Sequence, residues 1–253
     1  MDRHEPESYG DAFADVYDEW YADVSDVEGT VARVVELAGD HPVLELGIGT
    51  GRVALPLAAA GLSVSGIDAS AAMLDRLRAK PGGGALAVAR GDMADVDALA
   101  PPPGARFGVV LAAFNTLFNL VDADEQRRCL AGAAARLAPG GCVVVEGNVF
   151  DPAGLGPAGD SVAVRSLTPE RVVLSVSRAD PAGHRLSGQF VDLVDGAPVR
   201  LRPWALRTTT PAELDDLAGA GGLVLAERWG GWRGEPFTDE SDVHVSVYRI
   251  APV

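Results

Sequence analysis

The chain has 253 residues, of which 47% are hydrophobic, and it carries 21 basic and 36 acidic side chains for a net charge of −15. This composition predicts a globular core, and its acidity argues against a general nucleic-acid binder because the surface would repel phosphate. Lys80 is the only lysine, and its place in Arg-Ala-Lys-Pro excludes a P-loop, whose lysine must follow a glycine.

The two cysteines, Cys129 and Cys142, are too few for a metal cluster and are expected to be free thiols in the core. No run of 18 apolar residues is present, and the residues that follow Met1 include no apolar signal region. We therefore expect a soluble, cytoplasmic protein with no metal and no membrane partner.

Residues 7–38 are predicted to be helical. Aromatic side chains recur there at helical spacing on one face, namely Tyr9, Phe13, Tyr17, Trp20 and Tyr21. A core-facing stripe would explain this pattern. Since five of the chain's 15 aromatic residues fall within 13 positions, residues 1–40 are also predicted to form a helical lid over a ligand.

Strands and helices alternate from residue 42 onward. Short apolar runs predict strands at 42–46, 62–67, 85–89, 107–113 and 142–146, and the segments between them predict helices at 53–60, 70–79 and 122–137. The run at 107–113 is almost wholly apolar, as in a strand covered on both faces. This order predicts an α/β fold with a doubly wound, Rossmann-like parallel sheet.

The pattern changes after Asn148. Alternating runs at 161–164, 172–176 and 189–193 predict antiparallel strands, so 151–208 is interpreted as a β insertion after the fifth strand, within a single domain spanning 1–253. A helix at 210–220 and strands at 223–227 and 243–250 would complete the sheet. Unpaired strands of the insertion could pair across a two-fold axis, which suggests a homodimer.

The main chemical signal is the glycine-rich turn at 47–51, Gly47-Ile48-Gly49-Thr50-Gly51. Such a turn after a first strand lets the backbone approach a ligand at a helix N-terminus. Its spacing differs from the dinucleotide fingerprint, whose third glycine position holds Arg52. Glu45, two residues before the turn, would repel a pyrophosphate but suits a ligand bearing an amine.

Two further carboxylates follow the next two predicted strands. Asp68 ends the second strand, where a carboxylate can accept hydrogen bonds from both ribose hydroxyls. Asp92 follows the third strand and could accept from an adenine amine, while the Met93 N–H could donate to the ring. Together with the turn, these positions predict a site for S-adenosylmethionine (SAM).

The sequence resembles the class I SAM-dependent methyltransferases in four segments that lie in the expected order, at 45–51, 66–70, 91–93 and 136–141. It is similar, more narrowly, to actinobacterial natural-product methyltransferases, especially the amino-sugar N-methyltransferases, in its aromatic N-terminus, its insertion and its closing strand. The resemblance implies SAM as the cofactor. The residues assigned to cofactor binding are Glu45, Gly47, Ile48, Gly49, Thr50, Gly51, Asp68, Ala69, Met73, Asp92, Met93 and Phe114.

Chemistry in an open α/β sheet lies beyond the carboxyl ends of its strands. His244 begins a closing strand that should run antiparallel, so it is a candidate base, although a hydrogen-bonded structural histidine is the alternative. Tyr17 and Tyr21 are rival catalytic candidates, as hydrogen-bond partners of the ligand amine or the acceptor. Substrate contacts are predicted for Asn115, Trp204 and Trp232.

The insertion is rich in arginine, with Arg165, Arg171, Arg178, Arg185, Arg200, Arg202 and Arg207. These side chains could grip a phosphate or carboxylate of the acceptor, or they could form ion pairs with the surplus acids.

The sequence thus predicts an enzyme that transfers a methyl group from SAM to an amine or hydroxyl of a small molecule in natural-product biosynthesis, with no nucleic-acid partner. Two alternatives stay open. One is a SAM-binding protein that does not methylate, such as a cyclase or a regulatory module. The other is a nicotinamide oxidoreductase, which Glu45 and Arg52 disfavour.

Overall fold

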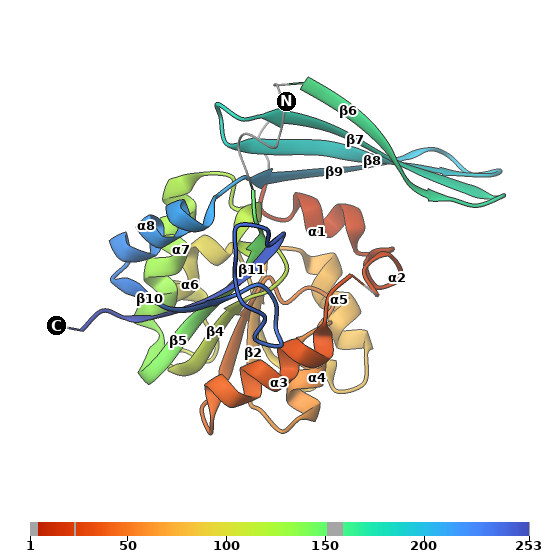
Figure 1. Cartoon of the computed structure of the whole chain (residues 1–253). Coiled ribbons are helices and arrows are strands. Elements are labelled where there is room, and N and C mark those ends of the chain that lie inside the picture. Colours follow the sequence, from red (N-terminus) through yellow and green to blue (C-terminus); the bar gives the residue numbers. More distant parts are fainter. Residues whose placement is uncertain (1–4, 23, 151–158, 253) are drawn as a thin grey trace.

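Seven strands form the central sheet of the computed structural model, which describes residues 5–22, 24–150 and 159–252 (Figure 1). Their order is β10-β11-β5-β4-β1-β2-β3, and only β11 runs against its neighbours. The predicted doubly wound sheet with an antiparallel closing strand is therefore confirmed. The strands are β1 Val43–Leu46, β2 Val64–Asp68, β3 Ala87–Arg90, β4 Phe107–Ala112, β5 Leu137–Asn148, β10 Leu223–Trp229 and β11 Val243–Ile250.

Helices cover both faces of this sheet (Figure 1). On one face lie α3 (Val27–Ala38), α4 (Ala54–Ala59) and α5 (Ala71–Ala79), and on the other α6 (Val96–Leu99), α7 (Ala123–Ala135) and α8 (Pro211–Ala220). Three short 3₁₀ helices, η1 Gly83–Ala85, η2 Met93–Asp95 and η3 Thr116–Asn119, lie in the connections. No helix of the described residues is long and apolar enough to cross a membrane.

The central strands are apolar along their whole length because both of their faces are covered. All six residues of β4 are buried, and their side chains alternate between the two helical layers. Val109 and Leu111 pack with α3 and α4, whereas Val110 and Ala112 pack with α7 and α8. Both cysteines are buried and unpaired.

The predicted N-terminal helical stretch is divided into α1 (Ser8–Phe13), α2 (Tyr17–Trp20) and α3. Asp26 sets the start of α3, because its side chain accepts the Gly29 N–H at 2.9 Å as an N-cap. The breaks allow α1 and α2 to lie across the carboxyl ends of the central strands (Figure 1).

A second, antiparallel sheet follows β5, as predicted, and lies against α1 (Figure 1). Its order is β6-β7-β8-β9, with β6 Gly159–Leu167, β7 Arg171–Asp180, β8 Arg185–Val194 and β9 Arg200–Arg207. Residues 151–158 of the predicted insertion lie outside the described residues. Strand β9 was not predicted, because its arginines and Pro203 interrupt the apolar alternation expected of a strand.

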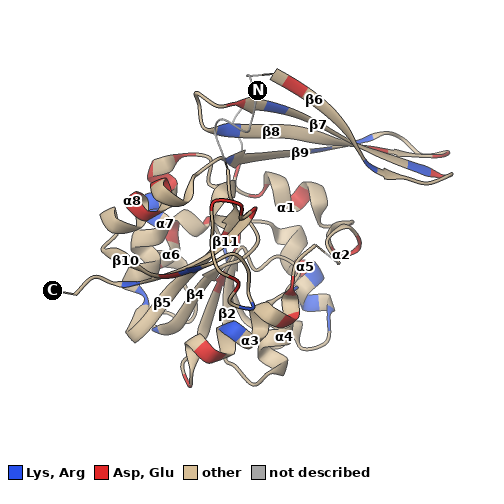
Figure 2. Cartoon of the chain, viewed as in Figure 1, with Lys and Arg blue, Asp and Glu red and all other residues tan. Residues whose placement is uncertain are grey.

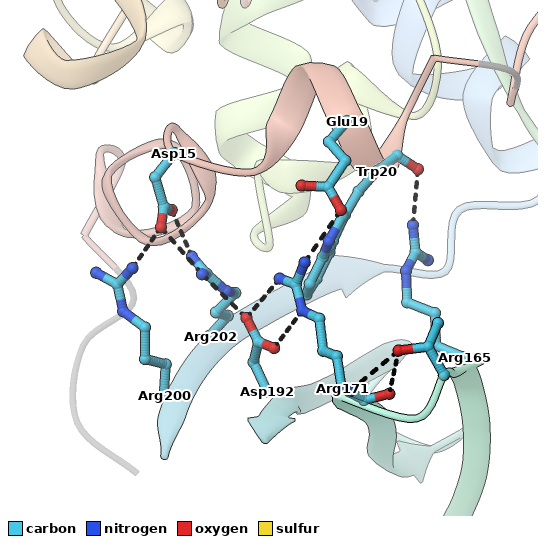
Figure 3. A network of polar contacts seen from close by, with 9 residues as sticks. Asp15, Glu19, Trp20, Arg165, Arg171, Asp192, Arg200 and Arg202 are labelled. Atoms are coloured by element: carbon cyan, nitrogen blue, oxygen red, sulfur yellow. Dashed lines mark hydrogen bonds and ion pairs between the residues drawn. The ribbon is translucent and has the colours of Figure 1, made fainter. Parts of the chain in front are cut away.

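A chain of ion pairs attaches the second sheet to α1 and to the segments around α2 (Figure 3). Arg202 donates to Asp15 at 2.6 Å and to Asp192 at 3.2 Å, and Arg171 donates to both oxygens of Asp192 at 2.7 and 2.8 Å and to Glu19 at 3.0 Å. Hydrogen bonds from Arg171 are the main cause that lowers the pKa of Asp192. The network is buried at its centre, where Asp192 and Arg202 are 2% and 3% exposed.

Ion pairing is thus the observed use of most arginines in the insertion. Those that contact carboxylates are Arg171, Arg178, Arg200, Arg202 and Arg207. Arg165 instead donates to the carbonyl of Trp20 and lies over the rings of Trp20, Tyr21 and Phe190.

Replacing Asp192 with Ala should therefore destabilise the fold strongly, because it removes the buried carboxylate that Arg171 and Arg202 share and leaves Arg202 paired with Asp15 alone among the described carboxylates. We expect a loss of about 3 kcal/mol in the free energy of unfolding, measured by urea denaturation. Asp160→Ala is the matched control, since it removes an exposed pair with Arg178 in the same sheet and should leave stability unchanged. Equal effects of the two substitutions would show that burial does not govern this network.

Candidate active site

The glycine-rich turn between β1 and α4 is built on left-handed backbone. Gly47 and Gly49 have φ angles of 60° and 55°, a region that a side chain rarely tolerates. A Cβ on Gly47 would also lie 2.6 Å from the Thr116 side chain, at the start of η3. The turn therefore presents backbone atoms without covering side chains at the end of β1.

Asp68, the last residue of β2, holds this turn in place. Its Oδ2 accepts the Gly49 N–H and its Oδ1 accepts the Ser70 N–H, both at 2.8 Å. Burial raises the pKa of Asp68, and these two N–H groups oppose the rise. Ser70 in turn caps α5, as predicted, by accepting the Met73 N–H at 3.1 Å.

One cavity of about 590 Å³ opens where the glycine turn, the N-terminal helices and the second sheet meet. Its first half is lined by residues from the ends of β1, β2 and β3, including Gly47, Gly49, Asp68, Ala69, Met73, Asp92 and Met93. Its second half is lined from η3, the end of β5 and strands β8 and β9, including Asn115, Asn119, Asn148, Phe150, Leu186, Phe190, Trp204 and Leu206. Phe114 lies in the lining as well.

The first two helices contribute Tyr9, Gly10, Tyr17 and Tyr21 to the same cavity. Three contacts tie them to the central sheet. Asp11 accepts from Ser70 Oγ at 2.6 Å, and Asp18 accepts from Thr50 Oγ1 at 2.6 Å and from Lys80 Nζ at 2.8 Å. The single lysine thus fixes α2 over the glycine turn.

The two tyrosines proposed for catalysis lie side by side in this cavity. The rings of Tyr17 and Tyr21 stack with centroids 4.7 Å apart, and Tyr9 donates its hydroxyl to the Tyr21 oxygen at 3.1 Å. Burial raises the pKa of Tyr17 above its usual value. Tyr17 therefore stays protonated near neutral pH, which suits a hydrogen-bonding role rather than that of a base.

Glu45 lies beneath the turn and outside the cavity lining. It is buried, and its Oε2 has no hydrogen-bond partner among the described residues. Burial raises the pKa of Glu45 to about 8, although the nearby Arg52 guanidinium opposes the rise. An orphaned acidic oxygen in this position fits a cationic group such as the ammonium of an amino acid.

The remaining predicted cofactor residues outside the lining have structural contacts. Ile48 packs over Gly66 in β2, and Gly51 has a φ of 81° and lies against Leu77 of α5. Thr50 is fully buried and reaches the helices through its bond to Asp18.

His244 is placed away from the cavity. Its ring is fully buried against Phe118, and its Nδ1 lies 2.9 Å from Ser246 Oγ. Burial lowers the pKa of His244 to about 4, so the ring is neutral at physiological pH. The Nδ1 contact fits the structural histidine that the sequence left as an alternative, while the buried Nε2 has no hydrogen-bond partner among the described residues.

Trp232 also lies outside this cavity. It is buried in the core cluster that includes α3, and it lines a separate, smaller cavity together with Arg33 and Arg233. Of the three predicted substrate residues, Asn115 and Trp204 line the large cavity. Among the described residues no group of three or more His, Cys, Asp or Glu side chains could hold a metal ion.

Several lining residues were not singled out from the sequence. Asn119 follows the predicted loop after β4, and Phe150, Leu186, Phe190 and Leu206 belong to or adjoin the insertion. The aromatic pair Phe190 and Trp204, on neighbouring strands, was the available signal, but it required the strand register to be known.

A doubly wound sheet that carries a glycine turn and an acid at the end of its second strand defines a Rossmann-like, nucleoside-binding enzyme. A family model described as a methyltransferase domain matches residues 43–141. The cypemycin N-terminal methyltransferase of a Streptomyces species is 32% identical over 249 residues, which cover 94% of this chain and 95% of that protein.

Solved structures agree with this match. The CcbJ methyltransferase from Streptomyces caelestis is 41% identical, with a TM-score of 0.88 over 98% of this chain and 100% of that chain. A SAM-bound amino pentose methyltransferase from Micromonospora echinaspora, involved in calicheamicin biosynthesis, shares the fold at 22% identity, with a TM-score of 0.65 over 98% of this chain and 99% of that chain.

The chain belongs to the SAM-dependent methyltransferases, among relatives from actinobacterial natural-product pathways. The resemblance inferred from the four sequence segments is thereby confirmed, and SAM is the cofactor. Membership in this family decides against the nicotinamide oxidoreductase and against a SAM-binding protein without transferase activity.

Glu45 should make stability depend on pH. Because the pKa of Glu45 is about 8 in the folded chain and near 4.5 in the unfolded chain, folding favours its protonated form. This contribution is fully present below pH 4.5 and is lost as the pH rises through 8. The side chain in Glu45→Gln stays neutral at every pH, so this variant should show a smaller decline in the free energy of unfolding as the pH rises. Urea denaturation of the ligand-free protein across this pH range measures the decline.

Glu36→Gln is the control for that series, because Glu36 lies on the surface of α3 and, among the residues described, pairs with Arg33 alone. It should follow the wild-type curve. An undiminished decline in Glu45→Gln would mean that another group titrates.

Proposed function

We propose that the protein transfers the methyl group of SAM to an amine nitrogen of a small molecule that carries an apolar portion, within natural-product biosynthesis. One observation carries the proposal: a single cavity joins the glycine turn and its carboxylates to an apolar wall supplied by the second sheet. The names of two relatives, an N-terminal methyltransferase and an amino pentose methyltransferase, support an amine acceptor.

The first half of the cavity fits the cofactor. We assign Asp68 to the ribose hydroxyls and Asp92 and Met93 to the adenine, and all three line the cavity. The orphaned oxygen of Glu45, which lies beneath the turn and outside the lining, is assigned to the charge of the ammonium. The backbone of Gly47 and Gly49 would pass close to the ligand. When bound, SAM supplies a methyl group already activated on a sulfonium.

The second half of the cavity would orient the acceptor. Phe150, Leu186, Phe190, Trp204 and Leu206 provide an apolar wall, and the amides of Asn115, Asn119 and Asn148 provide polar groups near η3. An amine needs only to arrive neutral, whereas a hydroxyl would benefit from a base. The protonated Tyr17 and the distant, neutral His244 favour the amine.

In this proposal α1 and α2 form the lid, and the contacts of Asp11 and Asp18 with the central sheet keep it closed. Closure would exclude water and hold the two reactants in line, and good positioning is worth about 7–11 kcal/mol of barrier. The net charge of −15 supports an acceptor that is not a nucleic acid.

Asp68→Ala should lose cofactor affinity by about 10- to 100-fold, because hydrogen bonds to a charged group contribute about 1.5–3 kcal/mol. Calorimetric titration with SAM, S-adenosylhomocysteine and NAD measures this loss. Asp75→Ala, which removes an exposed acid of α5, is the control and should bind as the wild type does. Binding of NAD alone would contradict the assignment of the turn to SAM.

The acceptor itself is tested with methyl-labelled SAM and pairs of amines and alcohols that share a skeleton, such as phenethylamine with 2-phenylethanol and amino sugars with their hydroxyl counterparts. We expect label in the amine of a pair and none in the alcohol. Transfer to alcohols alone would contradict the amine assignment.

We propose further that two chains associate through the outer face of the second sheet, the face turned away from α1. Strand register places an uncharged aliphatic row across all four strands, Val164-Leu174-Val191-Leu201. Val164 and Leu201 are each 61% exposed. Most of the length of the four strands carries no charge in Figure 2.

A second copy is the occupant that this face fits best. A row of this kind is complementary to itself across a two-fold axis. Elsewhere the net charge of −15 would oppose self-association. The four strands have 8–10 residues each. At about 3.3 Å per residue and 4.8 Å per strand, one face of the sheet, taken as a flat surface, covers roughly 500 Å². This approaches the roughly 800 Å² per partner of a standard interface.

Val164→Arg should convert the dimer to a monomer, because it places a charge in the aliphatic row of the proposed interface. Sedimentation velocity measures the change. Val224→Arg, at an exposed position of β10 in the central sheet, is the matched control and should stay dimeric. A monomeric wild type, or a dimer in both variants, would refute this surface.

A further inference from the structure

The turn after β4 has an unfavourable backbone. Phe114 and Asn115 are consecutive and both left-handed, with φ angles of 46° and 61°. Asparagine visits this region more readily than most residues, but a bulky phenylalanine rarely does. Such a conformation persists only where the surrounding structure holds it.

Glu146 of β5 supplies two of the bonds that hold this turn. Its side-chain Oε2 accepts the Phe114 N–H at 2.6 Å, and its backbone carbonyl accepts the Asn115 N–H at 3.0 Å. The ladder between β4 and β5 ends one residue earlier, at the pair Ala112 and Val145. The Glu146 carboxylate thus accepts a backbone N–H just beyond the last residue pair of the ladder.

The side chains of the turn are held as well. Asn115 Oδ1 accepts the Asn148 N–H at 2.7 Å, and the Arg52 guanidinium lies 5.3 Å from the centre of the Phe114 ring. Burial raises the pKa of Glu146, and the Phe114 N–H and the Arg52 charge oppose the rise. Phe114 is therefore held by its backbone on one side and by its ring on the other.

We propose that Glu146 is a positioning residue for methyl transfer, which fixes the Phe114–Asn115 turn at the border between the two halves of the cavity. Both residues of the turn line the cavity, while Glu146 itself does not. The inference rests on the proposed function, because it requires this cavity to be the site of transfer. Glu146 acts through the turn and not on the reactants.

The test compares Glu146→Gln with Glu146→Leu. Glutamine keeps a side-chain oxygen that can accept the Phe114 N–H, whereas leucine has a similar size and no acceptor. Glu227→Leu, at an exposed position of β10, is the matched control for the same change. Three quantities are measured: amide hydrogen exchange at Phe114 and Asn115 by NMR, the Kd of S-adenosylhomocysteine, and kcat/KM for the best amine found with labelled SAM.

We expect Glu146→Leu to lose exchange protection at both amides and to lower kcat/KM by about 10- to 100-fold, as a misplaced contact of about 1 Å does. Its Kd for S-adenosylhomocysteine should rise by less than kcat/KM falls, because Phe114 is one of many residues assigned to the cofactor. Glu146→Gln should recover protection and most of the activity, and Glu227→Leu should match wild type.

The proposal is overturned if Glu146→Leu keeps the protection or the activity, or if Glu146→Gln is as impaired as Glu146→Leu. It is also overturned if cofactor affinity falls as far as activity does, since that marks a general structural role. Should the wild type methylate no amine, the proposed function fails, and the exchange and binding measurements still decide whether Glu146 holds the turn.

Discussion

Four carboxylates near the N-terminus join the two sheets of the molecule. Asp11 and Asp18 bind groups of the central sheet, at Ser70, Thr50 and Lys80, while Asp15 and Glu19 bind arginines of the second sheet. The cavity depends on this arrangement, because both sheets contribute to its lining and the N-terminal helices contact both. The acidity of this segment therefore has a local structural purpose.

The central sheet could be predicted because its signals are local. An apolar run such as 107–113 is typical of a strand covered on both faces, and the spacing of Gly47, Gly49 and Gly51 allows few backbone conformations. Asp68 was found for the same reason, since its place follows from the end of β2. Features that depend on contacts distant in sequence were missed, namely β9 and the breaks between the first helices.

His244 illustrates this limit. Alternation along β11 places His244, Ser246 and Tyr248 on one face, where Ser246 bonds with Arg228 and Tyr248 bonds with Arg228 and Asp215. No local sequence pattern indicates which helical layer covers that face of β11. The covering layer is α8 and the core beneath it, so the histidine is buried and does not line the cavity. Glu146 was also missed, because the group that its side chain binds is a backbone N–H 32 residues away in the sequence.

The second sheet has two faces with different neighbours. Phe190, Trp204 and Leu206 face the cavity, whereas Val191 and Leu201, their neighbours along the same strands, face outward. Substitutions on the inner face can reshape the apolar wall of the cavity without touching the glycine turn or Asp68. The fold thereby separates the part of the enzyme that must stay constant from the part that is free to diverge, and lineages can acquire new acceptors while keeping one cofactor.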